Sequence, residues 1–523
     1  MKHLPSCFTS QLVSLIATLT MSSFRVLAVH VSPFCRELFY FMIMSVFGFL
    51  GLKIMKPRVP LPPSNFDLFF TSVSSATVSS MTAVEMEVFS NSQLILMTFL
   101  MFLGGEGFTS ILGLLFSSGF NLPQKQSLKN RATTHHIPHQ VPSPNQIEIN
   151  LVSLKKQNEL GVDDLSDSNI FQDDRLSRLK RRSVRCLGFV VLCSITVLHL
   201  VGSGLVSIYT SIVPSARQVL RNKGISIQTF SLFTIVSTIA SCGFVPTNEN
   251  MIVFKQNSGL LLLILPYVYL GNALYAPFVR FVIWVLEKVM KREEFTYILK
   301  NYKEIGYDHL LSGVHCWFLV ATVFGLNLIQ LVLFACMEWK SENMDGLNSY
   351  QKLIASLFQV SNARHAGESV FDLSGLSSAI LVLFVVMMYL PPYTTFLPIK
   401  DHENETKKGK ASLKECLLFS QLSYLVVFII LICITESKSM REDPLNFNVL
   451  SITLEVISAF GNVGFSMGYS CKRQLKADRS CRDLWIGLSG KWSNKGKFIL
   501  IVVMLFGRLK KYNMRGGQAW DLS

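Results

Sequence analysis

Repeated apolar stretches, each long enough to cross a lipid bilayer, constrain this chain more than any other feature. A helix of about 20 residues covers roughly 30 Å of hydrocarbon, the distance that a membrane span must cover. Five such stretches contain no Asp, Glu, Lys or Arg: residues 186–212, 258–279, 315–337, 374–399 and 416–435. Two weaker stretches, 38–56 and 93–119, are interrupted by Lys53 and Glu106. The pattern predicts an all-α polytopic membrane protein.

A last apolar stretch, 498–507, has only ten residues and lies between Lys497 and Arg508. Alone it would extend about 15 Å, so it must continue through its basic neighbours in order to cross. We therefore expect eight transmembrane helices. The composition agrees, because 50% of the residues are hydrophobic, only 16% are charged and the mean hydropathy is +0.39.

The formal net charge of +15 is concentrated between the apolar stretches. Basic residues gather in 120–185, 280–303 and 400–414 and in the tail after residue 509. Short loops rich in Lys and Arg stay in the cytosol, so we expect these loops and both termini to be cytosolic. The charge then points to a lipid bilayer as partner and not to nucleic acid.

Two segments of the chain each allow two interpretations. Gln11–Val29 is either a signal peptide or an interfacial or disordered lead-in, and its Arg25 and weak basic start favour the second. His135, His136 and His139 resemble a small metal cluster. Their proline-containing loop has no acidic or cysteine ligand nearby, which favours a disordered linker.

Two modification signals depend on the predicted topology. The glycosylation sequon at Asn404–Thr406 lies in a loop expected to be cytosolic, so we expect it to be unused. Cys471 and Cys481 lie in a polar loop on the predicted outer side. An oxidising environment permits a disulfide there, and two free thiols are the equally weighted alternative.

An internal repeat lies between the predicted spans. Within each pair of spans, a segment of about 15 residues is too short and too polar to cross. The four segments align on Ser80, Gly243, Gly367 and Gly464. Three columns then agree: serine six residues earlier (Ser74, Ser237, Ser361, Ser458), Val or Ile seven earlier (Val73, Val236, Val360, Ile457) and Phe or Leu ten earlier (Phe70, Phe233, Leu357, Leu454). Such agreement across four segments indicates a repeat.

The spacing in these segments predicts a short helix that enters the membrane and stops halfway. The last carbonyl groups of such a helix lack helical partners, and with the negative end of the helix dipole they stabilise a cation. Glycine suits the turn that follows, since it permits positive φ and close approach of the backbone to an ion. Four such loops around one axis predict a selectivity filter. The alternative, kinked helix ends with small residues for packing, is disfavoured because four segments are in register.

The repeat divides the chain into nine predicted segments. Four are repeats, four are loops or tails expected in the cytosol, and the first is cytosolic or interfacial. They are 1–37, repeat A at 38–119, the basic loop 120–185, repeat B at 186–290, the loop 291–308, repeat C at 309–399, the loop 400–414, repeat D at 415–514 and the tail 515–523.

At these residues the chain resembles the plant high-affinity potassium transporter family, HKT, of the wider Trk/Ktr/HKT superfamily. The matching stretches are 69–74, 77–81, 242–250, 362–368 and 461–465. The resemblance covers nearly everything from residue 38 onward, apart from the loop around 120–180. It implies four helix, pore-loop, helix (M1-P-M2) repeats around one central pore, and a homodimer in which each subunit has its own pore. It implies neither enzymatic activity nor a cofactor.

Carried over by position, the filter residues are Ser80, Gly243, Gly367 and Gly464. Serine at the first position resembles the Na+-selective subfamily, which implies passive Na+ transport across the plasma membrane in plant Na+ homeostasis and salt tolerance. The alternative is a Na+/K+ symporter or a K+-permeable member, which usually has four glycines. The chain departs from the family at three positions beside the pore: Ser241, Met467 and Phe506, where asparagine, threonine and tyrosine are usual.

Three polar residues inside the predicted spans are candidates for a role in the pore: Arg508, Glu106 and Asn272. Arg508 is expected either to line the cavity below the filter as a barrier to cations, or to extend to the cytosolic interface. Glu106 requires a partner, either a neighbouring pore helix or Arg508, with ion binding as the alternative. Asn272 follows Gly271 at one of four predicted breaks in the second helices. The breaks are Gly104–Gly105, Gly271–Asn272, Pro391–Pro392 and Gly507–Arg508.

Charged residues also flank the filter segments. Arg364 and His365 are expected to brace the third loop by hydrogen bonds. Four carboxylates near the outer mouth either concentrate cations there or are ordinary solvated loop charges: Glu85, Glu87, Glu249 and Glu368.

Overall fold

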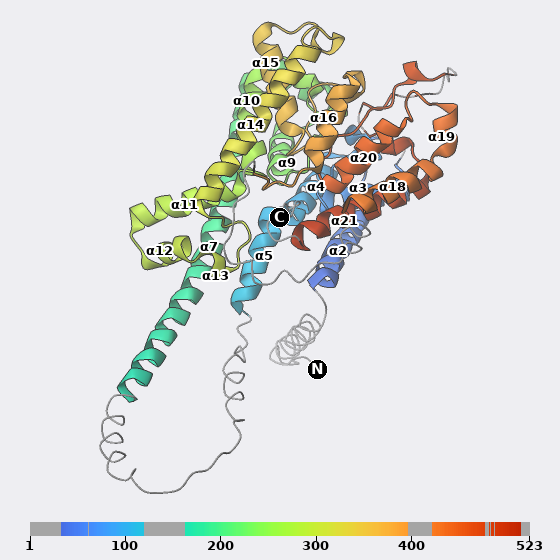
Figure 1. Ribbon diagram of the computed structural model, residues 1–523. Helices are drawn as coiled ribbons and strands as arrows, with labels where there is room; N and C mark the ends of the chain where they lie inside the picture. Colours follow the sequence, from blue (N-terminus) through green and yellow to red (C-terminus); the bar gives the residue numbers. More distant parts are fainter. Residues whose placement is uncertain are drawn as a thin grey trace, which may run out of the picture. The chain divides into compact units, whose positions relative to one another are not determined.

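The structure is a computed structural model that describes residues 33–60, 62–119, 163–395, 421–475, 481, 483–485 and 487–513 (Figure 1). These residues form helices and no strand, with one isolated antiparallel bridge between Tyr469 and Leu484. The all-α prediction is therefore confirmed. Several predictions fall outside the described residues: those on Gln11–Val29, the three histidines, Asn404–Thr406, the loop 400–414 and the tail 515–523.

The chain divides into two compact units, which we describe separately. The first unit comprises Met1–Phe108, Thr196–Pro277 and Gly313–Ser523, and the second Thr109–Ile195 and Phe278–Ser312. The helices within the first unit are α2 (Pro33–Ile54), α3 (Asn65–Ala76), α4 (Asn91–Gly104), α8 (Pro214–Asn222), α9 (Ile227–Ile239), α10 (Ser258–Leu270), α14 (Gly313–Glu338), α15 (Ser349–Asn362), α16 (Ser378–Tyr389), α18 (Gln421–Thr435), α19 (Ser437–Glu442), α20 (Val449–Gly461) and α21 (Asn494–Asn513). The second unit contains α12 (Glu293–Lys300) and α13 (Tyr302–Ile305). Three helices have residues in both units: α5 (Glu106–Gly119), α7 (Asp163–Ile212) and α11 (Tyr275–Met290).

Three described helices are long and apolar enough to cross a bilayer by length and composition: Phe34–Ile54, Arg175–Ile212 and Gly313–Glu338. Two helix pairs pass the same test together but bend at a short break, α4 with α5 by 49° and α10 with α11 by 83°. The described residues thus hold up to five candidate spans. The other three predicted spans contain α16, α18 and α21, which are shorter or more basic.

Three of the four predicted breaks in the second helices coincide with helix ends. Helix α4 ends at Gly104, α10 ends before Gly271, and α16 ends before Pro391. The fourth prediction is wrong, because α21 runs without interruption through Gly507 and Arg508. A single glycine inside a helix costs only about 1 kcal/mol, so it weakens a helix without ending it.

Four short helices, α3, α9, α15 and α20, lie in the four aligned segments. They have 12 to 14 residues, which corresponds to roughly 20 Å, too little to cross a bilayer. Each begins at a Ser or Asn whose side chain accepts a hydrogen bond from the backbone N–H three residues later. These capping residues are Ser64, Ser226, Asn348 and Asn448.

A partly buried ion pair joins two helices that are far apart in the sequence. Lys497 Nζ on α21 lies 2.7 Å from Asp67 Oδ1 in the first turn of α3, and the side chains are 7% and 20% exposed. Ser64 Oγ donates to the other Asp67 oxygen at 2.9 Å. The pair therefore fixes the start of α3 against α21 and leaves neither charge unpaired.

We expect Lys497→Gln to destabilise the protein by about 3 kcal/mol, because removing one partner of a buried pair leaves the other charge uncompensated. Thermal unfolding of the detergent-purified protein, followed by tryptophan fluorescence, measures the change. The control is Lys438→Gln, since Lys438 and Glu442 form an exposed pair at 3.8 Å with side chains 85% and 68% exposed, and such pairs contribute little. Equal unfolding temperatures for the two variants would contradict the structural role of Lys497.

Candidate functional site

The four residues on which the segments align follow the C-terminal ends of the short helices. All four have positive φ: +51° at Ser80, +93° at Gly243, +70° at Gly367 and +102° at Gly464. Glycine adopts this conformation without steric cost, whereas a residue with a Cβ pays roughly 1–2 kcal/mol. The first position is therefore the strained member of the set.

The residue two positions earlier shares this conformation in three of the segments. Val78, Ser241 and Asn462 have φ of +51°, +57° and +50°. Positive φ is a genuine outlier for a β-branched residue such as Val78. Strain of this kind persists where the surrounding structure enforces it, which is common at functional sites.

The four loops meet one another directly. A Cβ added to any of the three glycines would collide with the next loop, so only glycine fits. The collisions are with the carbonyl group of Ala366 for Gly243, with that of Val463 for Gly367, and with Ser80 Cβ, at 2.6 Å, and the Cys242 carbonyl for Gly464. The aligned residues thus form one cluster, in which Ser80 contributes the one side chain.

The serine six residues before each aligned position has different partners in different segments. Ser237 Oγ accepts the backbone N–H of Gly243 at 3.1 Å, and Ser458 Oγ accepts that of Gly464 at 3.1 Å. These bonds hold the second and fourth loops against their own helices. In the third segment, Ser361 Oγ donates to Leu357 O at 2.6 Å and bonds the Tyr269 hydroxyl, also at 2.6 Å.

Glycines in or directly after the following helices let the short helices approach closely. A Cβ on Gly104, Gly271 or Gly507 would collide with a carbonyl group in the last two residues of a short helix. These carbonyls belong to Ala76, Ile239 and Phe460, each four residues before an aligned position. Gly507 therefore serves for packing and not for bending, which explains why α21 continues through it.

In the third segment, Arg364 and His365 make the contacts with neighbouring elements that a closely packed glycine makes in the other three segments. Arg364 Nη2 donates to the carbonyls of Pro391 and Pro392, at 2.7 and 3.3 Å. His365 Nδ1 lies 2.6 Å from the Ser361 carbonyl, and its ring packs edge-on against Tyr269 with centroids 5.2 Å apart. Both side chains are buried, and both contact elements that neighbour the third loop.

Arg508 is buried, with 1% of its surface exposed. Its guanidinium donates to the Gly104 carbonyl at the end of α4 and lies 5.7 Å from the centre of the Phe41 ring. The Arg508 side chain therefore does not extend to the protein surface, as the cytosolic-interface alternative would require. The charge is instead held beside the break between α4 and α5, where a carbonyl is released from the helix.

Asn272 and Glu106, the other two polar residues predicted inside spans, each lie at a break between two helices: Asn272 between α10 and α11, and Glu106 between α4 and α5. Asn272 Nδ2 donates to the His365 carbonyl at 3.4 Å, which connects the end of α10 to the third loop. Glu106 is the first residue of α5, where the positive end of the helix dipole favours a carboxylate.

The outer carboxylates are engaged with partners in the structure. Lys223 Nζ lies 2.5 Å from Glu87 Oε1 and 2.6 Å from Glu249 Oε2. Burial alone would lower the pKa of Lys223, but hydrogen bonds and charge from Glu249 and Glu87 outweigh it and raise the pKa above its usual value. Glu85 accepts a hydrogen bond from Asn248 at 3.2 Å, and Glu368 one from Thr238 at 2.5 Å. Lys223 therefore offsets part of the negative charge of Glu87 and Glu249, and Glu368 is buried and not a solvated loop charge.

Two asparagines that sequence reasoning did not single out connect adjacent loops. Asn462 Nδ2 donates to Ser79 Oγ at 2.6 Å, from the fourth loop to the first. Asn250 bonds both Gly243 and Ser369, from the second loop to the third. Asparagine tolerates positive φ better than most residues, which is the one signal that the sequence offered.

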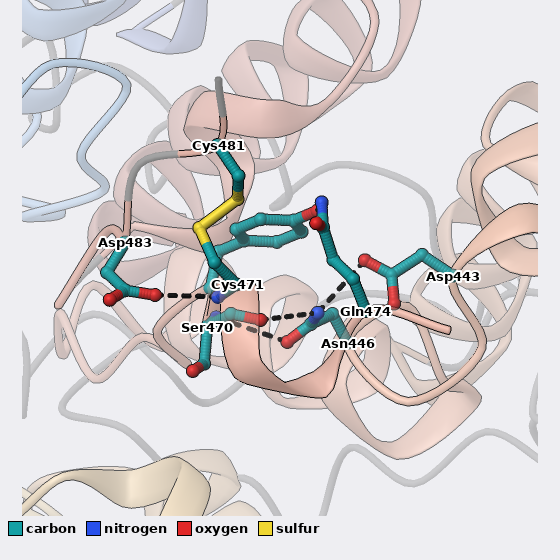
Figure 2. Close-up of a disulfide and its surroundings, with 8 residues drawn as sticks. Asp443, Asn446, Ser470, Cys471, Gln474, Cys481 and Asp483 are labelled. Atoms are coloured by element: carbon teal, nitrogen blue, oxygen red, sulfur yellow. Dashed lines mark hydrogen bonds between the residues drawn. A yellow bond between two sulfur atoms is a disulfide. The ribbon is translucent and has the colours of Figure 1, made fainter. Parts of the chain in front are cut away.

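Cys471 and Cys481 form a disulfide, the first of the two alternatives considered above (Figure 2). The Cys471 N–H donates to Asp483 at 2.6 Å. Asn446 exchanges hydrogen bonds with the backbone of Ser470, at 3.0 and 3.2 Å. The bridge therefore closes a loop whose base is tied to the segment before α20.

Comparison with known proteins identifies the family. Residues 168–514 match the TrkH family, described as a cation transport protein. The sodium transporter HKT1 of Arabidopsis thaliana is 50% identical over 483 residues, which cover 90% of this chain and 92% of the relative. The cation transporter HKT1;3 of Oryza sativa subsp. japonica is 48% identical, over 94% of this chain and 92% of the relative.

The fold is similar to a solved structure at much lower identity. The crystal structure of the potassium transporter TrkH from Vibrio parahaemolyticus matches with a TM-score of 0.50 and 13% identity, over 92% of this chain and 83% of that one. A polytopic helical membrane fold is thus supported independently of close sequence similarity. The chain therefore belongs to the TrkH family, together with the plant HKT transporters, and it is a membrane cation transporter and not an enzyme.

Proposed function

We propose that Ser80, Gly243, Gly367 and Gly464 form the selectivity filter of a Na+-selective pore, through which Na+ moves passively. The observation that supports this most is the cluster of four positive-φ residues, each at the end of a short helix and in contact with the next loop. Carbonyl groups at such helix ends replace the water around a cation, and the helix dipoles add a negative potential.

Preference for Na+ is supported by the unequal first position. Ser80 Cβ lies against Gly464, so one corner of the filter is narrower and stiffer than four glycines would make it. A ring with one unequal corner coordinates the larger K+ less symmetrically. A relative that is 50% identical is named a sodium transporter, which agrees with this choice over Na+/K+ symport.

The proposal extends to the setting of the pore. The plasma membrane and a homodimer with one pore per subunit are what the family resemblance implies, and the cytosolic termini are what the basic loops imply. The basic residues within and after α11, and those just before the apolar part of α7, agree with a cytosolic side there. The fixed charge of Arg508 beside α4 would raise the barrier to cations on the cytosolic side of the filter.

Gly367→Ala is expected to abolish the current, because its Cβ would collide with the Val463 carbonyl group. Overpacking of this kind costs about 1–3 kcal/mol and displaces the backbone. Voltage-clamped oocytes expressing the full chain, with surface protein measured by biotinylation, provide the test. Gly306→Ala is the matched control, since Gly306 has nearly the same φ, +71° against +70°, and no atom within 4 Å of the added Cβ. A conducting Gly367→Ala with unchanged selectivity would remove this residue from the filter.

Ser80→Gly should raise the K+/Na+ permeability ratio by roughly five-fold, which corresponds to about 1 kcal/mol, because the first corner then becomes equal to the other three. Reversal potentials recorded in Na+ and then K+ baths give the ratio independently of expression level. The same recordings on the wild type discriminate uniport from symport, since a symporter current in Na+ would depend on external K+. An unchanged ratio in Ser80→Gly would show that this serine is a packing residue.

Arg508→Gln is expected to increase the inward current or change its rectification at equal surface expression, since it removes a fixed cation near the ion path. Arg508→Lys keeps the charge and should retain the wild-type current-voltage relation. If the Gln variant has the wild-type relation as well, the role of Arg508 is confined to holding the Gly104 carbonyl.

A further inference from the structure

The outer part of the second loop contains a buried asparagine whose three hydrogen bonds all involve backbone near the cluster. Asn250 is 4% exposed and has φ of +55°. Its Nδ2 donates to the Gly243 carbonyl at 3.2 Å, and its Oδ1 accepts the N–H of Met251 at 2.9 Å and that of Ser369 at 3.2 Å. A flipped amide would point its NH2 group at two N–H donors, so these partners allow one orientation only.

This asparagine lies where two loops join. Met251 N–H also donates to the Ser369 carbonyl at 3.0 Å, so the second and third loops are paired through backbone on the outer side of the cluster. On the other side, Gly243 lies against Ala366 and Gly367. The Asn250 amide therefore connects the Gly243 carbonyl to the loop that carries Gly367.

The turn that contains Asn250 is fixed by its own hydrogen bonds and by an ion pair to Lys223. Thr247 accepts the Asn250 N–H at 3.1 Å through its carbonyl, and its hydroxyl donates to the Asn250 carbonyl, so residues 247–250 form a closed turn. Glu249, the preceding residue, is paired with Lys223. Because the Asn250 backbone is fixed, its side-chain amide restricts the movement of the Gly243 carbonyl to which it donates.

We propose that Asn250 is a positioning residue of the pore that determines its ion selectivity. Its amide fixes the Gly243 carbonyl and ties it to the third loop, so the two corners cannot widen independently to fit a larger cation. The inference rests on the proposed function, because it takes Gly243 to be a filter residue. Loss of the amide donor should therefore admit K+ more readily without closing the pore.

Two substitutions separate the donor from the backbone conformation. Asn250→Asp is close in shape and keeps the acceptor for Met251 and Ser369, but it loses the donor and adds a charge. Asn250→Gly removes the side chain without charge and accepts the positive φ freely. Asn257→Asp is the matched control, because the Asn257 amide donates to Ser215 at 2.8 Å, at an exposed position.

Reversal potentials in paired Na+ and K+ baths, at equal ionic strength and with measured surface expression, provide the readout. Both Asn250 variants lose the hydrogen bond to the Gly243 carbonyl, so both should raise the K+/Na+ permeability ratio at least about five-fold, the factor that corresponds to one hydrogen bond of typical net strength. Asn257→Asp should match the wild type. A general folding defect would lower the current without moving the reversal potential. Wild-type reversal potentials in both Asn250 variants would overturn the proposal, and so would a shift in Asn250→Asp alone, since that shift would come from the added charge.

Where a variant carries too little current for a reversal potential, a second measurement compares it with the wild type. The unfolding temperature of the purified protein is measured in Na+ and in K+, and the difference between the two temperatures is taken. A difference equal to that of the wild type would overturn the proposal, and its loss would support it.

Failure of the proposed function itself would give a different result. A wild type that conducts no Na+, or prefers K+, would contradict the Na+-selective pore whatever the Asn250 variants do.

Discussion

Carbonyl groups at the ends of four short helices lack helical partners, and much of the surrounding structure follows from them. A bilayer supplies no water to satisfy these groups, so each must meet a cation or a hydrogen-bond donor, such as the N–H groups of the loop that follows. Glycines at positions 104, 271 and 507 give three helix ends the close approach of a neighbouring helix. In the third segment, Arg364 instead donates to the carbonyls released after α16.

The loops beyond these helix ends are held by one another as much as by their own helices. Asn462 joins the fourth loop to the first, and Asn250 joins the second to the third. Farther out, Lys223 brings Glu87 and Glu249 together across the first and second segments. In the proposed filter, hydrogen bonds therefore connect neighbouring loops, so a substitution in one loop also changes the position of the loop bonded to it. This is the physical basis for expecting selectivity, and not only stability, to depend on residues outside the four corners.

The four segments share a plan but not the same interactions. The serine six positions before the aligned residue accepts the N–H of the aligned glycine in the second and fourth segments, while in the third it joins the network with Tyr269 and His365. The first segment carries the one side chain in the cluster, at Ser80, and a strained Val78 before it. In the proposed pore, these unequal interactions would allow the corner at Ser80 to discriminate between cations while the three glycine corners keep the ion path open.

Local patterns in the sequence were sufficient to predict the all-α class, the positions of the short helices, three of the four helix ends near Gly104, Gly271 and Pro391, and the residues that form the cluster. These features depend on apolar length, capping residues and glycine, all of which act within a few residues of the chain. The break at Gly507 was predicted wrongly, because glycine was taken as a bend when it serves for contact with Phe460.

The sequence by itself determined that this chain is a membrane protein with four related segments, and that one of them carries serine where three carry glycine. Only the tertiary structure decided what the polar residues do: Arg508 meets the Gly104 carbonyl, Lys223 pairs with Glu87 and Glu249, and Asn250 spans two loops. Gly104, which accepts from Arg508, and Ser369, which donates to Asn250, each lie more than 100 residues from their partner, and no local pattern encodes a contact between groups so distant along the chain. Periodicity specifies which face of a helix is apolar, whereas the pairing of buried donors and acceptors is settled only when the segments pack together.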